Sequence, residues 1–278
     1  MIKYNPTDIY YMNTIECNQK CSKCSHWKKK DTASRLETQK VINAILEIPN
    51  SREFCIVGGE PLLFKNEIIE ILKGVSVKKN LRTTIITNGV LLSDNLVNKI
   101  KGFNIHIVVS IDTLNNELWK YVRGSNSMDL VLRNFENAVK ILKPEQISIQ
   151  SVLSKETEPY IKDVAKYASK FGIYHSIQDY VSEGFEGEWT PLDNKVSFIP
   201  DNEQQCYAAG RNLSIMQNGD VFTCFQQSWI KGCEKPLGNL NTQTIEEILS
   251  NEYSEFVYKK MKKCNLPCKV LKCNVKND

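Results

Sequence analysis

The sequence predicts an α/β fold with a parallel sheet, because strand-like and helix-like segments alternate along most of its length. Short apolar runs typical of buried strands occur at residues 8–15, 53–57, 82–87, 104–111, 146–153 and 173–179. Amphipathic helix patterns separate these runs, at residues 37–48, 65–77, 93–101, 128–143 and 157–171. Repeated strand–helix units of this kind form parallel sheets that bind ligands at the carboxyl ends of their strands.

The composition changes after the sixth strand pattern. Residues 182–191 show no clean period and contain Gly and Pro, which is typical of a connector. A loop that covers the ligand-binding end of the strands is the alternative. Further on, Asn218-Gly219 is a strong hairpin signal between two apolar strands, and residues 244–249 have a helix-like pattern.

Size and charge exclude several classes of protein. The 278 residues are 41% hydrophobic and 24% charged, as in an ordinary globular protein. A net charge of +4 is too mild to indicate nucleic acid as a partner. We find no long apolar run and no signal-peptide core at the start, so we expect a cytoplasmic protein that does not engage a membrane. Ten cysteines in such a protein indicate metal binding rather than disulfides.

Three cysteines near the start, Cys17, Cys21 and Cys24, are the most informative residues. Their C-x3-C-x2-C spacing places three thiolates on one short loop, and the next cysteine is Cys55. Three thiolates can hold three irons of a four-iron cluster and leave the fourth iron open to a small molecule. A structural zinc site is normally closed by four ligands, so the trio favours an open iron–sulfur cluster.

Four more segments follow in order, all on the predicted ligand-binding rim: Gly58-Gly59-Glu60-Pro61, Ile86-Thr87-Asn88-Gly89, Ser110-Ile111-Asp112 and Arg123-Gly124. With the cysteine trio they resemble the motifs of the radical S-adenosylmethionine (SAM) superfamily. This resemblance implies an open (β/α)6 partial TIM barrel over about residues 1–185. It also implies a [4Fe-4S] cluster on the three catalytic cysteines, with SAM bound to that cluster.

The same resemblance assigns the expected cofactor-binding residues: Gly58, Gly59, Glu60 and Pro61 at the amino end of SAM, then Asn88, Ser110, Asp112 and Arg123. Arg123 has a physical case of its own, because a guanidinium matches a carboxylate in bidentate fashion. An ordinary surface position is the alternative for Arg123. One departure from the family pattern is Lys23, since many members carry an aromatic residue just before the third cysteine. His26 and Trp27 either supply that aromatic surface or pack the loop.

A second group of cysteines occupies the last third of the chain: Cys206, Cys224, Cys264, Cys268 and Cys273. The predicted hairpin would return Cys224 towards Cys206. The arrangement resembles the SPASM/twitch extension of radical SAM enzymes, which implies a small C-terminal iron–sulfur domain at 201–278 after a connector at 186–200. The spacing departs from the full two-cluster layout, so we expect one auxiliary [4Fe-4S] cluster. Cys206 and Cys224 are its firmest ligands, with Cys264, Cys268 and Cys273 completing it; a zinc ribbon is the alternative.

The two remaining cysteines have separate interpretations. Cys55 lies in an apolar strand pattern and is expected to be a small buried hydrophobe. Cys233 lies in a Gly-containing loop, where a free thiol is favoured over a cluster-region cysteine or a hydrogen-atom donor to substrate. Tyr174, Gln178 and Tyr180 are either substrate-facing or packed.

The resemblance implies an enzyme that cleaves SAM reductively and removes a hydrogen atom from its substrate. We expect oxidative modification of a peptide, such as a cross-link, or of a small polyol. Dehydrogenation or epimerisation of a sugar or aminoglycoside alcohol is an alternative, and a non-catalytic iron–sulfur or zinc protein that binds nucleic acid is another. The expected partners are a low-potential electron donor such as flavodoxin or ferredoxin and, for a peptide substrate, a separate peptide-recognition protein.

Overall fold

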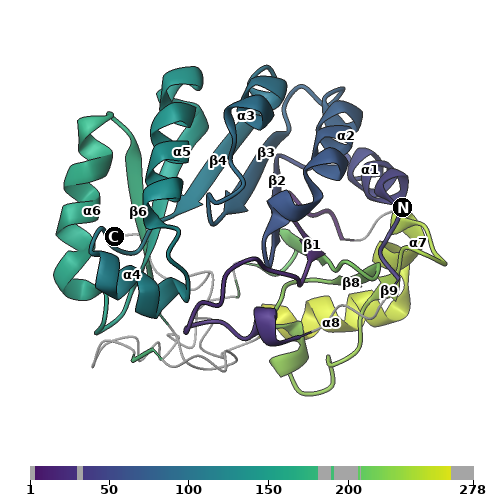
Figure 1. Ribbon diagram of the computed structural model, residues 1–278. Coiled ribbons are helices and arrows are strands. Elements are labelled where there is room, and N and C mark those ends of the chain that lie inside the picture. Colours follow the sequence, from purple (N-terminus) through teal and green to yellow (C-terminus); the bar gives the residue numbers. More distant parts are fainter. Residues whose placement is uncertain (1–3, 30–33, 181–188, 191–205, 207, 264–278) are drawn as a thin grey trace.

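The structure is a computed structural model that describes residues 4–29, 34–180, 189–190, 206 and 208–263. Its centre is a nine-stranded sheet in the order β6-β5-β4-β3-β2-β1-β7-β8-β9 (Figure 1). The first six strands pair in parallel, as predicted: β1 (Asp8–Thr14), β2 (Glu53–Gly58), β3 (Arg82–Thr87), β4 (Ile105–Ser110), β5 (Ile147–Leu153) and β6 (Tyr174–Asp179). The barrel is open because β1 pairs with β7 instead of β6.

Helices alternate with these strands and cover one face of the sheet (Figure 1). They are α1 (Thr38–Glu47), α2 (Lys65–Val75), α3 (Asp94–Ile100), α4 (Asn116–Arg123), α5 (Met128–Ile141) and α6 (Glu158–Lys170), with 3-10 turns at His26–Lys28, Pro61–Phe64 and Pro144–Gln146. Apolar residues of the helices, such as Ile45, Ile71 and Phe135, are fully buried in one core with strand residues such as Ile56 and Ile149.

All of the helices predicted from periodicity between the strands are present, whereas α4 was not predicted. It is short and mostly polar on its exposed side. Asn115 caps its first turn by accepting a hydrogen bond from the Leu118 amide at 2.9 Å. Gly124 ends it with φ of +58°, and a Cβ there would lie 2.3 Å from the carbonyl oxygen of Lys20. The glycine therefore lets the cysteine loop approach the end of α4 closely.

The strand register determines which residues line the inside of the open barrel. Ser110 is paired with Gln150, and Gln150 with Ser176. Because side chains alternate along a strand, these three share a face, opposite the face that packs on the helices. The inner face is therefore polar at β5 and β6, and the helix-covered face is apolar.

The C-terminal region extends the same sheet. β7 (Asn212–Ile215) lies parallel to β1, and β8 (Asp220–Phe222) and β9 (Gly238–Asn239) follow in antiparallel pairs. The predicted hairpin is confirmed, with Gly219 at φ of +91° in its turn. The helices α7 (Ile245–Ser250) and α8 (Glu252–Lys262) lie at this end of the sheet, after a 3-10 turn at Gln227–Trp229 (Figure 1). Periodicity gave no sign that β7 would join β1.

Within these described ranges, none of the helices combines the length and apolar character needed to cross a bilayer.

Candidate functional site

A cavity opens at the carboxyl ends of β2, β3 and β4, where the sequence places its motifs. Its walls hold the three cysteines and five of the eight predicted cofactor residues: Cys17, Cys21, Cys24, Gly58, Gly59, Asn88, Ser110 and Arg123. Gln19, Lys23, Trp27, Val57, Ile86 and Thr87 complete the lining. The remaining predicted cofactor residues, Glu60, Pro61 and Asp112, are buried behind this surface.

The cysteine loop is held in place by contacts with α4 and the turn after it. The amides of Lys20 and Ser22 each donate to a carbonyl near the end of α4, at 3.3 Å. The Gln19 side-chain amide donates to the Ser127 hydroxyl at 2.9 Å, and its carbonyl accepts from the Cys21 thiol at 3.8 Å. Trp27 donates from its indole nitrogen to the Cys21 carbonyl at 3.1 Å. Contacts distant in sequence therefore fix a loop that has little regular structure of its own.

Burial disfavours the thiolate form of two cysteines of this loop, Cys17 and Cys24, and so raises the pKa of each. Burial raises the pKa of Cys17 to about 11, and the neighbouring Cys21, Glu60 and Cys24 raise it further against a backbone hydrogen bond from Gln19. Burial likewise raises the pKa of Cys24. A coordinating metal deprotonates such thiols outright. Among the described residues the three thiols line one cavity but do not form a ready-made metal cage, so a bound metal would have to draw them together and deprotonate them.

Glu60 supports the cavity from behind. Its carboxylate accepts hydrogen bonds from the Thr87 hydroxyl at 2.7 Å, the Asn88 amide at 2.7 Å and the Leu62 amide at 3.0 Å. The side chain is fully buried, and burial raises its pKa while these hydrogen bonds oppose the rise. The visible role of Glu60 is to fix the turn that presents Asn88 to the cavity.

Gly58 and Gly59 are required by backbone crowding. A Cβ on Gly59 would lie 2.1 Å from the carbonyl oxygen of Glu16, and one on Gly58 would lie 2.5 Å from that of Thr14. The segment after β2 therefore packs directly against the end of β1, where the cysteine loop begins. Any larger residue would displace that loop.

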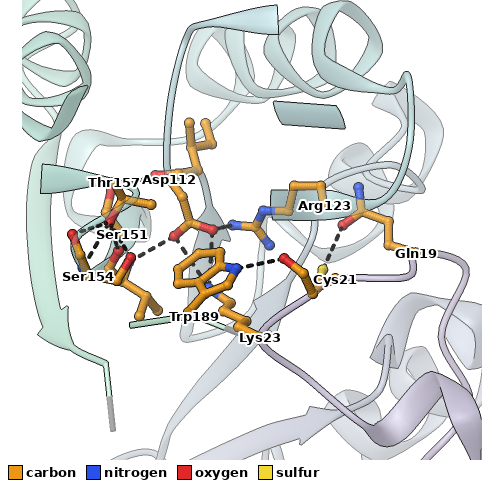
Figure 2. Close-up of polar contacts among 12 residues, drawn as sticks. Gln19, Cys21, Lys23, Asp112, Arg123, Ser151, Ser154, Thr157 and Trp189 are labelled. Atoms are coloured by element: carbon orange, nitrogen blue, oxygen red, sulfur yellow. Dashed lines mark hydrogen bonds and ion pairs between the residues drawn. The ribbon is translucent and has the colours of Figure 1, made fainter. Parts of the chain in front are cut away.

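Asp112 binds two cations at once, the buried Arg123 and the partly buried Lys23 (Figure 2). Its Oδ2 lies 2.7 Å from Arg123 Nη2 and 3.1 Å from Lys23 Nζ, and its Oδ1 accepts from the Val152 amide at 2.8 Å. Burial alone would raise the pKa of Asp112, but Arg123 and Lys23 hold it below the usual value. Arg123 is only 3% exposed, which rules out the surface position considered as its alternative.

The structure describes three of the C-terminal cysteines, Cys206, Cys224 and Cys233, all of which belong to or pack against the main core. Cys224 follows β8, and both it and Cys206 are close enough to the buried Tyr4 hydroxyl to raise its pKa, after burial itself. Cys233 is fully buried in the main core, which favours a packed thiol over a hydrogen-atom donor to substrate. Cys264, Cys268 and Cys273 lie outside the described residues.

The sequence matches the profile of the Radical SAM superfamily over residues 14–168, more than half of the chain. The chain belongs to the radical SAM superfamily. Residues 206–274 match the SPASM iron–sulfur cluster-binding domain, so the chain is of the SPASM/twitch type.

Two curated relatives match 66% and 88% of this chain. A probable GTP 3',8-cyclase of Methanococcus aeolicus is 32% identical over 191 residues, 66% of this chain and 59% of that protein. The radical SAM cyclopropyl synthase TigE of Paramaledivibacter caminithermalis is 26% identical over 88% of this chain and 57% of its own length. The chain thus spans less than two thirds of each.

A likeness to a solved structure supports the fold. SuiB of Streptococcus suis, solved with its precursor peptide SuiA, superimposes with a TM-score of 0.74 at 15% identity. The match covers 95% of this chain and 72% of SuiB. The open (β/α)6 partial barrel with a C-terminal iron–sulfur domain is confirmed by this likeness and by the sheet order.

The residues fit the cofactors of a radical SAM protein, which are a [4Fe-4S] cluster, SAM and auxiliary iron–sulfur centres. Three free thiols line one cavity, and sulfur is the donor that iron–sulfur clusters prefer. Nε of Arg123 is buried and, in the described part of the chain, has no hydrogen-bond partner. Burial alone would lower the pKa of Arg123, but Asp112 and the nearby Cys21 thiol raise it. An unsatisfied donor beside a cysteine is suited to a negatively charged cluster.

Two other predictions have definite outcomes. Cys55 is buried within β2, and burial raises its pKa to about 12, as expected for an inert thiol.

The two tyrosines considered as substrate-facing differ in position. Tyr174 is the first residue of β6, so it lies at the strand end opposite the cavity. Tyr180 packs its ring against Trp189.

Sequence reasoning missed Gln19 and treated Lys23 only as a departure. The signal for both was available, because they lie between the ligand cysteines on the same short loop.

Proposed function

We propose that this protein uses SAM to oxidise a peptide, joining or desaturating residues by removal of hydrogen. Cys17, Cys21 and Cys24 hold the SAM-binding cluster in this proposal. Cys206 and Cys224, with cysteines beyond residue 263, hold one auxiliary cluster that accepts the second electron. When bound, SAM and its cluster supply the reductive cleavage that produces a carbon radical able to remove a substrate hydrogen atom.

The observation that carries the proposal is the continuous sheet. β7 pairs with β1 through four residue pairs, Asp8–Asn212 to Tyr11–Ile215, so the cysteine-bearing hairpin is built directly on the barrel wall. β1 also leads into the Cys17 loop. A rigid connection between the two cysteine regions suits electron transfer from a substrate radical to a second centre, and therefore net oxidation.

The inner wall favours an uncharged, hydrogen-bonding substrate. The face shared by Ser110, Gln150 and Ser176 continues at Gln178, which is paired with Val152. Amide and hydroxyl side chains match the donors and acceptors of a peptide main chain. The peptide-bound SuiB supports this substrate class, and the similarity to TigE extends over both regions of the chain.

A nucleotide triphosphate, as the GTP 3',8-cyclase relatives would imply, is less well matched. Lys23 and Arg123 are the Lys and Arg residues in the described cavity lining, and both are paired with Asp112. Asp112 partly neutralises both positive charges, so the described lining is a weak match for a triphosphate. A polyol shares the uncharged chemistry of a peptide and is therefore the main alternative substrate.

The chain's own residues have three tasks in this reaction. The cysteine loop and its α4 contacts position the cluster ligands, and the Glu60-supported turn presents Asn88. The Asp112 network keeps Arg123 and Lys23 at the cavity wall. The inner strands β4–β6 hold the substrate near the cavity, where positioning supplies much of the rate. A flavodoxin or ferredoxin would supply the electron, and a separate peptide-recognition protein would deliver the substrate.

The test uses anaerobically reconstituted protein with SAM, dithionite and synthetic peptides for each short open reading frame beside its gene. We expect formation of 5'-deoxyadenosine together with a peptide that has lost two hydrogen atoms by mass spectrometry. A parallel reaction contains inositols and aminocyclitols. Oxidation of one of these polyols, with every peptide unchanged, would overturn the peptide assignment.

A further inference from the structure

The outer surface of the cysteine loop carries lysines that have no acidic partner. The segment from Cys17 to Lys29 contains four lysines and neither Asp nor Glu. Lys20, Lys28 and Lys29 are exposed, and within the described part of the chain none of the three forms an ion pair. Three exposed lysines on helices, by comparison, are each paired with a carboxylate one helical turn away: Lys120, Lys166 and Lys259.

Trp27 connects these lysines to the cavity. Lys20 Nζ lies 6.0 Å and Lys28 Nζ lies 5.5 Å from the centre of the Trp27 ring. The indole donates a hydrogen bond to the Cys21 carbonyl at 3.1 Å, and the same side chain lines the cavity with the three cysteines. In the described cavity lining, Lys20, Lys28 and Lys29 are absent. These three lysines therefore mark the outside of the loop whose inside carries the ligand cysteines.

Lys29 and Tyr121 extend this outer surface. Burial raises the pKa of Cys24, and Lys29 is close enough to be among the groups that oppose this rise. Tyr121 is 48% exposed, and its carbonyl accepts a hydrogen bond from the Ser22 hydroxyl at 3.1 Å, where the loop passes the end of α4 (Figure 1). An exposed aromatic ring beside uncompensated positive charge suits contact with an acidic protein. We call Lys20, Lys28, Lys29 and Tyr121 the outer patch.

The proposed reaction consumes an electron at this loop. A cluster on Cys17, Cys21 and Cys24 has to gain one electron from outside the protein before SAM is cleaved. A substrate has to enter the cavity, whereas an electron only requires close approach to the loop. The outer patch offers this approach, because Trp27 alone links its lysines to the Cys21 carbonyl.

We propose that the outer patch is the docking surface for a small acidic electron-carrier protein of the flavodoxin type. The reduced carrier loses one electron and the cluster gains it, so no proton or other atom is transferred. The lysines steer the carrier to the loop and orient it there. The inference rests on the proposed function only for the need of an electron, and it does not depend on the identity of the substrate.

The first test neutralises the patch in a Lys20→Gln, Lys28→Gln, Lys29→Gln triple variant of the reconstituted protein. The dissociation constant of oxidised flavodoxin, measured by anaerobic calorimetry, should rise about tenfold, as expected for the loss of three exposed charge pairs. Added salt should weaken flavodoxin binding more in the unmodified protein than in the variant. With reduced flavodoxin at limiting concentration, 5'-deoxyadenosine should form more slowly in the variant. With dithionite, which needs no docking surface, the two proteins should cleave SAM at the same rate.

The matched control changes Lys73, Lys99 and Lys140 to Gln. These exposed lysines lie in the last turns of α2, α3 and α5. Helices that connect parallel strands run back along the sheet, so these turns lie at the end of the barrel opposite the cavity. The control loses the same net charge and should bind flavodoxin as the unmodified protein does. Equal weakening in the two triple variants would mean that only net charge matters and would overturn the patch.

The second test concerns the aromatic part of the patch. Tyr121→Ser should raise the dissociation constant of flavodoxin about three- to tenfold, because buried tyrosines are frequent hot spots of protein interfaces. Tyr174→Ser is the control, since Tyr174 is 72% exposed at the strand end opposite the cavity. It should leave flavodoxin binding unchanged. Equal effects of the two changes would exclude Tyr121 from the docking surface.

Two further results would overturn the proposal as a whole. One is unmodified protein that cleaves SAM with dithionite but receives no electron from reduced flavodoxin. The other is a Lys20, Lys28, Lys29 triple variant that binds flavodoxin normally and binds the peptide substrate more weakly, which would assign the patch to the substrate. Failure of the proposed function has a different signature, because both electron sources would then give 5'-deoxyadenosine without an oxidised peptide.

Discussion

The two cysteine regions of this molecule are assembled in different ways. Cys17, Cys21 and Cys24 come from one short loop, so their spacing keeps the three thiols near one another, and contacts with α4 hold that loop at the cavity. Cys206 and Cys224 are separated by a hairpin, and both raise the pKa of Tyr4, after burial itself, in a region built by the pairing of β7 with β1 and of β8 with β7. Local spacing determines the first site, whereas strand pairing determines the second.

This difference has a physical consequence for how each site can fail. The N-terminal loop has little regular structure and depends on contacts with α4, Asp112 and Trp189. The positions of Cys206 and Cys224 depend instead on the pairing of β7 with β1 and on packing near Tyr4. Substitutions around the first site should alter cofactor binding, and substitutions at the second should alter what happens after SAM cleavage.

The largest expected effect is the loss of SAM cleavage when Cys17, Cys21 and Cys24 are all changed to Ala. Without these ligands the SAM-binding cluster cannot form, so 5'-deoxyadenosine should fall below detection. The iron content should drop by about four per chain, which leaves an auxiliary cluster in place. Cys55→Ala is the control, because Cys55 is buried outside both sites, and it should keep its iron and its activity. A triple variant that still cleaves SAM would disprove the assignment of the active cluster.

The second-largest expected effect distinguishes the roles of the two cysteine regions. A Cys206→Ala, Cys224→Ala double variant should also lose about four irons per chain. It should still cleave SAM, since the N-terminal loop makes no use of these residues, but it should no longer give oxidised product. The ratio of product to 5'-deoxyadenosine measures this uncoupling. A double variant in which cleavage and oxidation fall together would mean that the second region supports the first instead of accepting an electron.

A third prediction concerns the support of the N-terminal site. Asp112→Ala would leave Lys23 and Arg123 buried without their shared carboxylate, at a cost of about 3–5 kcal/mol in the free energy of unfolding. Urea unfolding of cluster-free protein measures this cost without a contribution from iron. Glu53→Ala is the matched control, because the Glu53–Arg82 pair is 40–49% exposed and should contribute about 0–1 kcal/mol. Similar losses from both variants would contradict the role of the Asp112 network.

The contrast between local spacing and strand pairing also explains which features of the molecule could be predicted from the sequence. The strand and helix periods predicted the parallel sheet and the helices of the barrel, and the cysteine spacing predicted the first site, because both are local patterns; the open barrel itself was implied by the family resemblance. The pairing of β7 with β1 leaves no trace in local periodicity. Glu60 and Asp112 were identified by motif, but their place behind the cavity wall depends on hydrogen bonds to Thr87, Asn88 and Val152. Trp189 was not singled out, since its contacts with Ser22 and Lys23 span most of the chain.

The smallest effect on the free energy of unfolding is expected from Glu60→Gln. This variant tests whether Glu60 acts on SAM only through the Asn88 turn at the cavity wall. The carboxylate accepts three hydrogen bonds from the protein itself, and a glutamine amide of the same shape can accept at only one of its two terminal atoms. We therefore expect the free energy of unfolding to fall by about 1–3 kcal/mol in cluster-free protein. The affinity for SAM should fall only as far as the Asn88 turn is displaced. Thr87→Val, which removes one of the same hydrogen bonds from the other side, should give a smaller change of the same kind. If Glu60→Gln instead abolishes SAM binding with no loss of stability, Glu60 contacts the cofactor directly and turns into the cavity when SAM binds.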